Sequence, residues 1–112
     1  MAYDEGFANR VRSAVDRKVT APVEEKRMFG GIALMLGGNM AVVIRGKGGL
    51  MIRVDPDETA KLAAEPGAEV TEMRGRPMRG WITVAPDACA KDADLRRWVQ
   101  RGVTYTQTLP TK

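Results

Sequence analysis

The stretch of residues 32–54 constrains the fold more than any other part of the chain, because it contains three short apolar runs separated by glycine-rich turns. The runs cover residues 32–36, 40–45 and 50–54. Apolar runs of this length bounded by glycine are typical of strands. Gly37, Gly38 and Asn39 tolerate the positive φ angles of a tight hairpin, and residues 46–49 supply a second flexible turn. The stretch therefore predicts a three-stranded antiparallel meander.

The first strand of this meander is predicted to begin earlier, at residues 23–29. Gly30 and Gly31 interrupt it, and we expect a bulge or bend there, after which residues 32–36 continue the same strand. Alternation along this strand and along residues 50–54 predicts one face made of Ile32, Leu34, Leu36, Leu50, Ile52 and Val54.

Helical periodicity precedes and follows the meander. Residues 3–18 carry apolar side chains at helical spacing, and Pro22 ends the pattern. Asp55 and Pro56 start a short helix to about residue 64, with Leu62 facing inward. The first predicted helix buries Phe7, Val11, Ala14 and Val15.

The last third of the chain predicts two short strands and a final helix. The strands cover residues 70–73 and 81–84 and are joined by a loop at residues 74–80. Asp92 or Asp94 is expected to cap the helix, and Pro110 to mark its end. Its predicted apolar stripe is Leu95, Trp98, Val99, Tyr105 or Thr106, and Leu109.

The predicted order of elements is therefore α-β-β-β-α-β-β-α, an α+β fold with an antiparallel sheet packed by helices. At 112 residues the chain has room for one continuous core, so we expect a single domain over residues 1–112.

Composition excludes several classes of function. Eighteen basic and 14 acidic residues are interleaved, so the net charge of +4 makes only a weak field for polyanions. The chain has no histidine, which removes the commonest general base and transition-metal ligand, and we expect no cofactor or metal. No apolar run approaches a membrane span, and Asp4 and Glu5 stand where a secretory signal would be basic, so we expect a cytoplasmic protein.

Several motifs, in this order and spacing, resemble the N-terminal domain of the TfoX/Sxy family, named after bacterial regulators of natural competence. They are VEEKRMFGG at residues 23–31, the run 32–36 with Asn39 and Met40, GRPMRGW at residues 75–81 and DLRRW at residues 94–98. The resemblance implies an α+β fold with the same element order and a regulatory or protein-interaction role in competence or transcription. The family offers no established catalytic residues to map here, so we expect a non-enzymatic domain. Competence regulators of the family add a helical C-terminal domain, which we expect this chain to lack.

The best candidate for an anion or nucleic-acid contact is the loop with Arg74, Arg76 and Arg79 beside Trp81, because guanidinium groups bind phosphates in pairs. The alternative is a solvated loop whose arginines pair with Glu69 and Glu72, and we favour this alternative. A small enzyme that uses the same loop and Cys89 is a further alternative, although Cys89 lacks a histidine to activate it.

Two other features concern partners. Lys26 and Arg27 are left free for a partner once Met28 and Phe29 are assigned to the core. Methionines fall in or next to several strands, where they either form an apolar sheet face for a protein partner or a homodimer, or fill the core beneath helices on both faces. The methionines concerned are Met28, Met35, Met51, Met73 and Met78.

Overall fold

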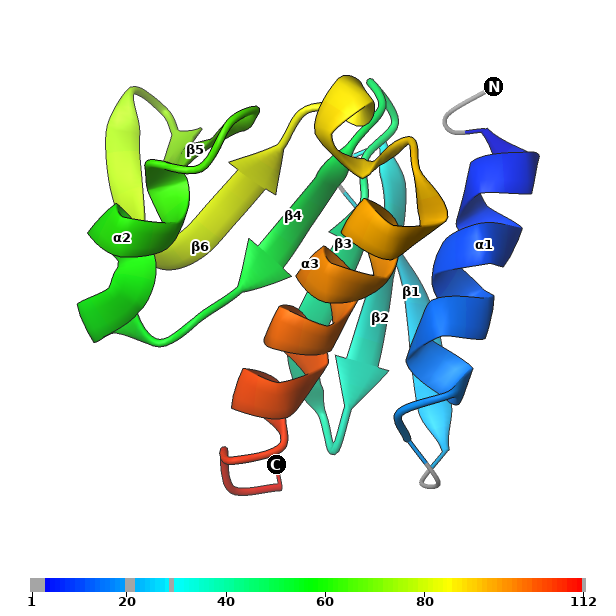
Figure 1. Ribbon diagram of the computed structural model, residues 1–112. Coiled ribbons are helices and arrows are strands. Elements are labelled where there is room, and N and C mark those ends of the chain that lie inside the picture. The colour runs from blue at the N-terminus through cyan, green and yellow to red at the C-terminus, as the bar shows by residue number, and fades with distance from the viewer. Residues whose placement is uncertain (1–3, 20–21, 29, 112) are drawn as a thin grey trace.

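The computed structural model describes residues 4–19, 22–28 and 30–111. Within them the chain forms one six-stranded antiparallel sheet of order β1-β2-β3-β4-β6-β5, with three α-helices (Figure 1). The α+β class and the predicted order of helices and strand groups are confirmed. The strands are β1 (Val23–Met28), β2 (Gly31–Leu36), β3 (Asn39–Ile44), β4 (Leu50–Arg53), β5 (Ala68–Met73) and β6 (Arg76–Val84).

The first strand group differs from the prediction, because β1 and β2 are two antiparallel strands and not one bent strand. Met28 pairs with Gly31 across a tight turn in which Gly30 has a φ of 72°. A Cβ atom on Gly31 would fall on the carbonyl oxygen of Ile44, so only glycine fits against β3 here. Paired glycines serve a bulge and a reversal equally well, and the structure uses them to reverse the chain. The meander therefore has four strands. Phe29, which we predicted at the end of the first strand, lies outside the described residues.

The loop predicted at residues 74–80 is also largely strand. Arg74 and Gly75, with φ angles of 53° and 78°, form the turn, and β6 begins at Arg76. Pro77 and the neighbouring glycines suggested a loop. Pro77 is tolerated because this part of β6 pairs only with β5, opposite Glu72, and β4 joins β6 from Trp81 onward.

All three α-helices cover the same face of the sheet, as Figure 1 shows. They are α1 (Glu5–Asp16), α2 (Thr59–Ala63) and α3 (Asp92–Thr106), and short 3₁₀ turns η1 (Pro56–Glu58) and η2 (Pro86–Cys89) precede α2 and α3. The predicted inward residues Leu62, Leu95, Trp98 and Val99 are buried against the sheet, together with the predicted strand face. These residues form the main core.

Gly102 sets how closely α3 approaches the sheet. A Cβ atom at this position would lie 2.8 Å from Cγ2 of Ile52 and 2.9 Å from the carbonyl oxygen of Ala41. The absence of a side chain therefore lets the helix backbone rest directly on β3 and β4.

The start of α3 differs from the prediction. Lys91 occupies the cap position without a side-chain hydrogen bond, and Asp92 and Asp94 lie in the first turn. Acidic side chains favour both positions, because the first turn carries the positive end of the helix dipole. By contrast, Asp4 caps α1 and accepts a hydrogen bond from the backbone nitrogen of Phe7 at 2.9 Å. No helix in the described part of the chain is long and apolar enough to span a membrane.

Candidate functional site

The face of the sheet that the helices leave uncovered carries a second apolar cluster. Ala33, Met35, Val43, Met51 and Trp81 form it, and Met28, Met40 and Met78 pack against it. The main core on the other face contains no methionine among its buried residues. We call this second cluster, with its three flanking methionines, the methionine face. The interpretation in which helices cover both faces is therefore wrong for the described chain, and Met73 lies outside the cluster as an exposed residue of β5.

The methionine face is closely packed within itself. Ala33 and Val43 are fully buried, whereas Met35, Met51 and Trp81 remain 9%, 7% and 7% exposed. Met28, Met40 and Met78 are partly exposed around them. The outer layer of this face is therefore made of thioether and indole groups, which are apolar and polarizable.

Arg53 places a positive charge on this face. It lies opposite Trp81 in the β4–β6 ladder, and its guanidinium carbon is 5.0 Å from the centre of the indole ring. Its Nε atom is buried and has no hydrogen-bond partner among the described residues. The guanidinium group thus retains an unused donor beside the apolar cluster.

The structure does not gather the predicted arginines into one site. Arg74 and Arg76 are exposed at the β5–β6 turn, whereas Arg79 binds Asp57 at 2.6 Å and donates from Nε to the carbonyl oxygen of Pro56 at 3.1 Å. None of the three forms an ion pair with Glu69 or Glu72 among the described residues, so the pairing expected from the sequence is absent there. Binding of an anion by this loop stays a prediction, and lower retention of Arg→Gln variants on heparin would test it.

The other predicted contacts are also separated. Trp81 lies in the methionine face rather than with the turn arginines. Lys26 and Arg27 are exposed on β1, at the opposite edge of the sheet from β5. Lys26 pairs with Ala33 and so shares its face, while Arg27 pairs with Ile32 on the helix side. Lys26 is thus the one of the two that borders the methionine face.

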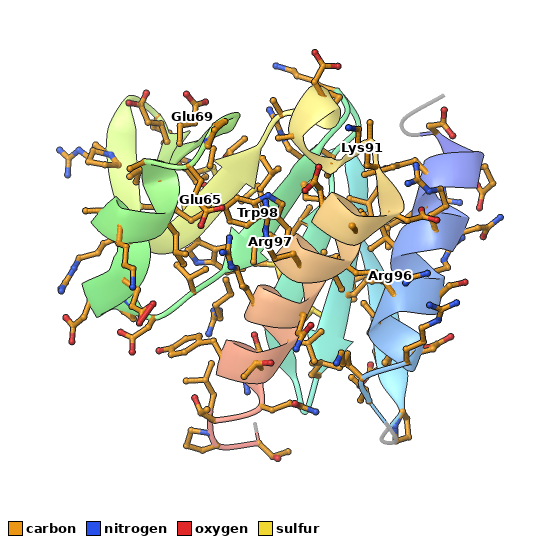
Figure 2. All side chains as sticks on the ribbon, in the orientation of Figure 1. Glu65, Glu69, Lys91, Arg96, Arg97 and Trp98 are labelled. Carbon is orange, nitrogen blue, oxygen red and sulfur yellow. The ribbon has the colours of Figure 1, made fainter. Side chains whose placement is uncertain are left out.

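A groove between α2 and α3 was not predicted as a site. It has a volume of about 520 Å³ and is lined by Val54, Leu62 and Tyr105 together with charged side chains. Figure 2 shows Glu65, Arg97 and Trp98 between the two helices. The residues that line this groove come from segments far apart in sequence, so no local pattern signalled it.

Glu65 bridges α2 to α3 at this groove. Its carboxylate accepts from Nη1 of Arg101 at 3.0 Å and lies 2.8 Å from Nη2, and Arg97 lies 3.6 Å away. The hydrogen bond from Arg101 lowers the pKa of Glu65, against the raising effect of its burial. Arg101 also stacks on Trp98, with 4.6 Å between its guanidinium carbon and the ring centre. Glu65 therefore holds both arginines.

Cys89 lies in the main core and is fully buried. Its Sγ atom donates to the carbonyl oxygen of Ala85 at 3.4 Å, and burial raises the pKa of the thiol to about 11. A thiol with this pKa is protonated near neutral pH and is a poor nucleophile. The described residues also contain no group of three or more acidic or cysteine side chains that could hold a metal ion.

The comparison with known families identifies the domain. The model of the TfoX N-terminal domain matches residues 17–105 of the chain. The chain belongs to the TfoX N-terminal domain family. A comparison with curated proteins finds no match. The TfoX N-terminal domain is not a known enzyme family. Its matched range includes both faces of the sheet, α2 and most of α3, while α1 precedes it.

Proposed function

We propose that this TfoX-like chain is a non-enzymatic regulatory domain that binds a protein partner through the methionine face. The observation that carries the proposal is the segregation of methionine: five methionines lie in or against the uncovered cluster, and the buried core on the other face has none.

This segregation is unusual for an antiparallel sheet. Such sheets commonly have one face packed on the core and the other face polar, because the second face contacts water. Here the second face carries apolar side chains from β2, β3, β4 and β6. Methionine side chains have three rotatable bonds and adapt to different apolar surfaces, so they are suited to a binding face.

The charge on the methionine face indicates the chemistry of the partner. Arg53 has an unused buried donor within the face, and the border strand β1 carries charges of both signs, with Lys26 opposite Ala33 and Glu24 opposite Met35. A partner segment with apolar side chains and a carboxylate would cover the methionines and accept from Arg53. The proposed partner is therefore an apolar protein segment with a carboxylate for Arg53.

The proposed regulatory role follows from the family, whose namesakes regulate competence. The proposal of a non-enzymatic role is supported by the composition and by Cys89, because the chain has no histidine and the thiol is buried and protonated.

Site-specific photo-crosslinking tests the proposal. A photoreactive residue in place of Met40 should crosslink to a protein partner in cells of the source organism, and the crosslink should fall when Arg53 is replaced by Gln. Met73 is the matched control, because it is an exposed methionine on the same sheet that lies outside the cluster. Equal crosslinking from positions 40 and 73, or none from either, would contradict the proposal.

Self-association is the other outcome to be distinguished. Sedimentation over a range of concentrations, with the methionine methyl signals followed by NMR, shows whether a second copy covers the face. Changes at Met28, Met40 and Met78 that grow with concentration, without a change at Met73, would identify a homodimer as the partner.

A further inference from the structure

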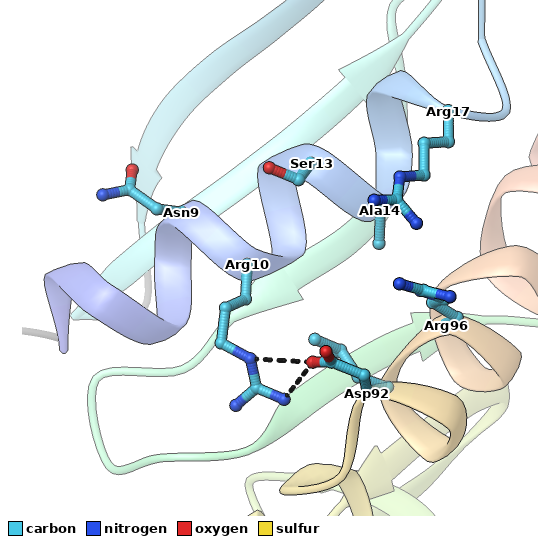
Figure 3. A pocket seen from close by; sticks show the side chains of 8 residues that line it. Asn9, Arg10, Ser13, Ala14, Arg17, Asp92 and Arg96 are labelled. Carbon is cyan, nitrogen blue, oxygen red and sulfur yellow. Dashed lines mark hydrogen bonds and ion pairs between the residues drawn. The ribbon is translucent and has the colours of Figure 1, made fainter.

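A pocket between α1 and α3 lies apart from the methionine face and has a different chemistry. Its volume is about 250 Å³. Ala14 and Leu95 are buried and form its apolar floor, while Arg10, Arg17 and Arg96 line its sides. Figure 3 shows these arginines around the space between the two helices.

The spacing of residues on α1 explains how the pocket forms. Ser13 and Ala14 lie three and four residues after Arg10, and four and three residues before Arg17, so all four lie on one side of the helix. Ala14 is small, and its short side chain leaves space between the longer ones. Arg96 comes from α3, across the same space.

Arg10 is held in place by α3 and the segment before it. Its Nε and Nη2 atoms donate to Oδ1 of Asp92 at 3.2 and 2.7 Å, and Nη2 donates to the carbonyl oxygen of Ala90 at 2.6 Å. The hydrogen bond from Arg10 lowers the pKa of Asp92, and the charges of Arg96 and Arg17 lower it further through space. The one carboxylate of the pocket is therefore already engaged.

The side chains of Arg17 and Arg96 have no hydrogen bond or ion pair in the described part of the chain. Three guanidinium groups thus surround one carboxylate, which leaves two positive charges in excess. Like charges that converge on one space repel each other, and the single carboxylate balances only one of the three. A doubly charged anion would compensate both charges.

We propose that this pocket binds the phosphate group of a small phosphomonoester. Arg17 and Arg96 donate to its terminal oxygens from α1 and α3, and the Ser13 hydroxyl lies on the same wall as a further donor. A phosphomonoester offers three such oxygens and a charge close to two. The volume is below the range of about 300–1,000 Å³ typical of ligand clefts, so the pocket suits a phosphate head group with a short organic substituent.

A small ligand fits this geometry better than a nucleic acid. Polyanion binding uses a row of cationic side chains that follows the phosphate backbone. The next arginines along α3, Arg97 and Arg101, are instead bound to Glu65. Along α3, the excess positive charge therefore ends at Arg96.

Calorimetric titration with inorganic phosphate and with phenyl phosphate tests the proposal, with chloride at matched ionic strength as the reference. Both phosphates should bind saturably at about pH 7.5 and more weakly at about pH 5, where the second proton returns to the phosphate. The double variant Arg17→Gln/Arg96→Gln should weaken binding about a hundredfold, because each of the two charged hydrogen bonds is worth about a factor of ten.

Two variants distinguish specific binding in this pocket from nonspecific attraction to positive charge. Lys47→Gln/Lys61→Gln removes the same number of exposed positive charges away from the pocket and should leave binding unchanged. Ser13→Leu keeps every charge but fills the pocket, and it should weaken binding; circular dichroism confirms that each variant is folded. Equal losses in the two double variants, chloride competing as well as phosphate, or binding of an oligonucleotide but of neither phosphate would overturn the proposal.

Discussion

The two faces of the sheet are both closely packed, but with different kinds of side chain. The helix-covered face is built from leucine, isoleucine and valine with Trp98, and the methionine face is built from methionine with small residues and Trp81. β-Branched side chains have few rotamers and specify one arrangement, whereas methionine adapts. In the proposed function, one face fixes the fold and the other adapts to a partner.

The two faces can be compared at Ile52 and Met51, which are neighbours on β4 and lie on opposite faces. Ile52 is fully buried in the main core, and Met51 is buried in the methionine face. We expect Ile52→Ala to lower the free energy of unfolding by about 4 kcal/mol and Met51→Ala by about 2 kcal/mol, because the flexible face can close around the deletion. Urea denaturation of both variants measures the difference. Equal losses would break the distinction between the faces.

Substitution of Gly102 tests how closely α3 must pack on the covered face of the sheet. Alanine at this position would gain helix propensity, but its Cβ would meet Ile52 and the backbone of β3. We expect Gly102→Ala to destabilise the fold by about 2 kcal/mol. Gln100→Ala, at an exposed position of the same helix, is the control and should change thermal stability little. A stabilised Gly102→Ala variant would show that α3 can move away from the sheet.

Glu65 tests the link between α2 and α3 on the covered side. Because its pKa in the folded chain lies below its ordinary value of 4.5, the ionised carboxylate stabilises the fold. Glu65→Gln should cost roughly 1 kcal/mol at neutral pH. This loss should be complete above pH 4.5 and should vanish as the pH falls through the lower folded pKa, which denaturation of both proteins across acidic pH can follow. A loss that does not depend on pH would assign the role of Glu65 to packing.

The smallest expected change in stability is at Arg53, on the methionine face. Replacement by Gln removes the stacking on Trp81 and should cost roughly 0.5 kcal/mol of stability. The same variant should clearly lower the yield of the crosslink from position 40, although the domain stays folded. A large stability loss would instead make Arg53 part of the fold.

Local patterns predicted most of the fold. The alternation of Leu50, Ile52 and Val54, and the helical spacing of Leu95, Trp98 and Val99, depend on nearby residues and were confirmed by their burial. The turn at Gly30 was mistaken for a bulge, because positive φ is required by both.

The site was much less predictable, since its contacts join distant segments. Arg79 and Asp57 are 22 residues apart, Arg101 and Glu65 are 36 apart, and Arg10 and Asp92 are 82 apart. No periodicity in one sequence relates such positions. The sequence predicted part of the methionine face, because several of its residues alternate with residues of the covered face. It did not predict which side of the sheet the helices cover.

The buried thiol of Cys89 has a practical consequence for kinetic work. It is the one cysteine of the chain, and as a buried thiol with a pKa of about 11 it should resist alkylating and disulfide reagents while the core is closed. The rate at which Cys89 is labelled should then be set by global unfolding, either by the unfolding rate or by the population of the open state. The natural chain therefore needs no introduced probe to measure its unfolding. Cysteines introduced at the surface could be labelled in the native state without removing it.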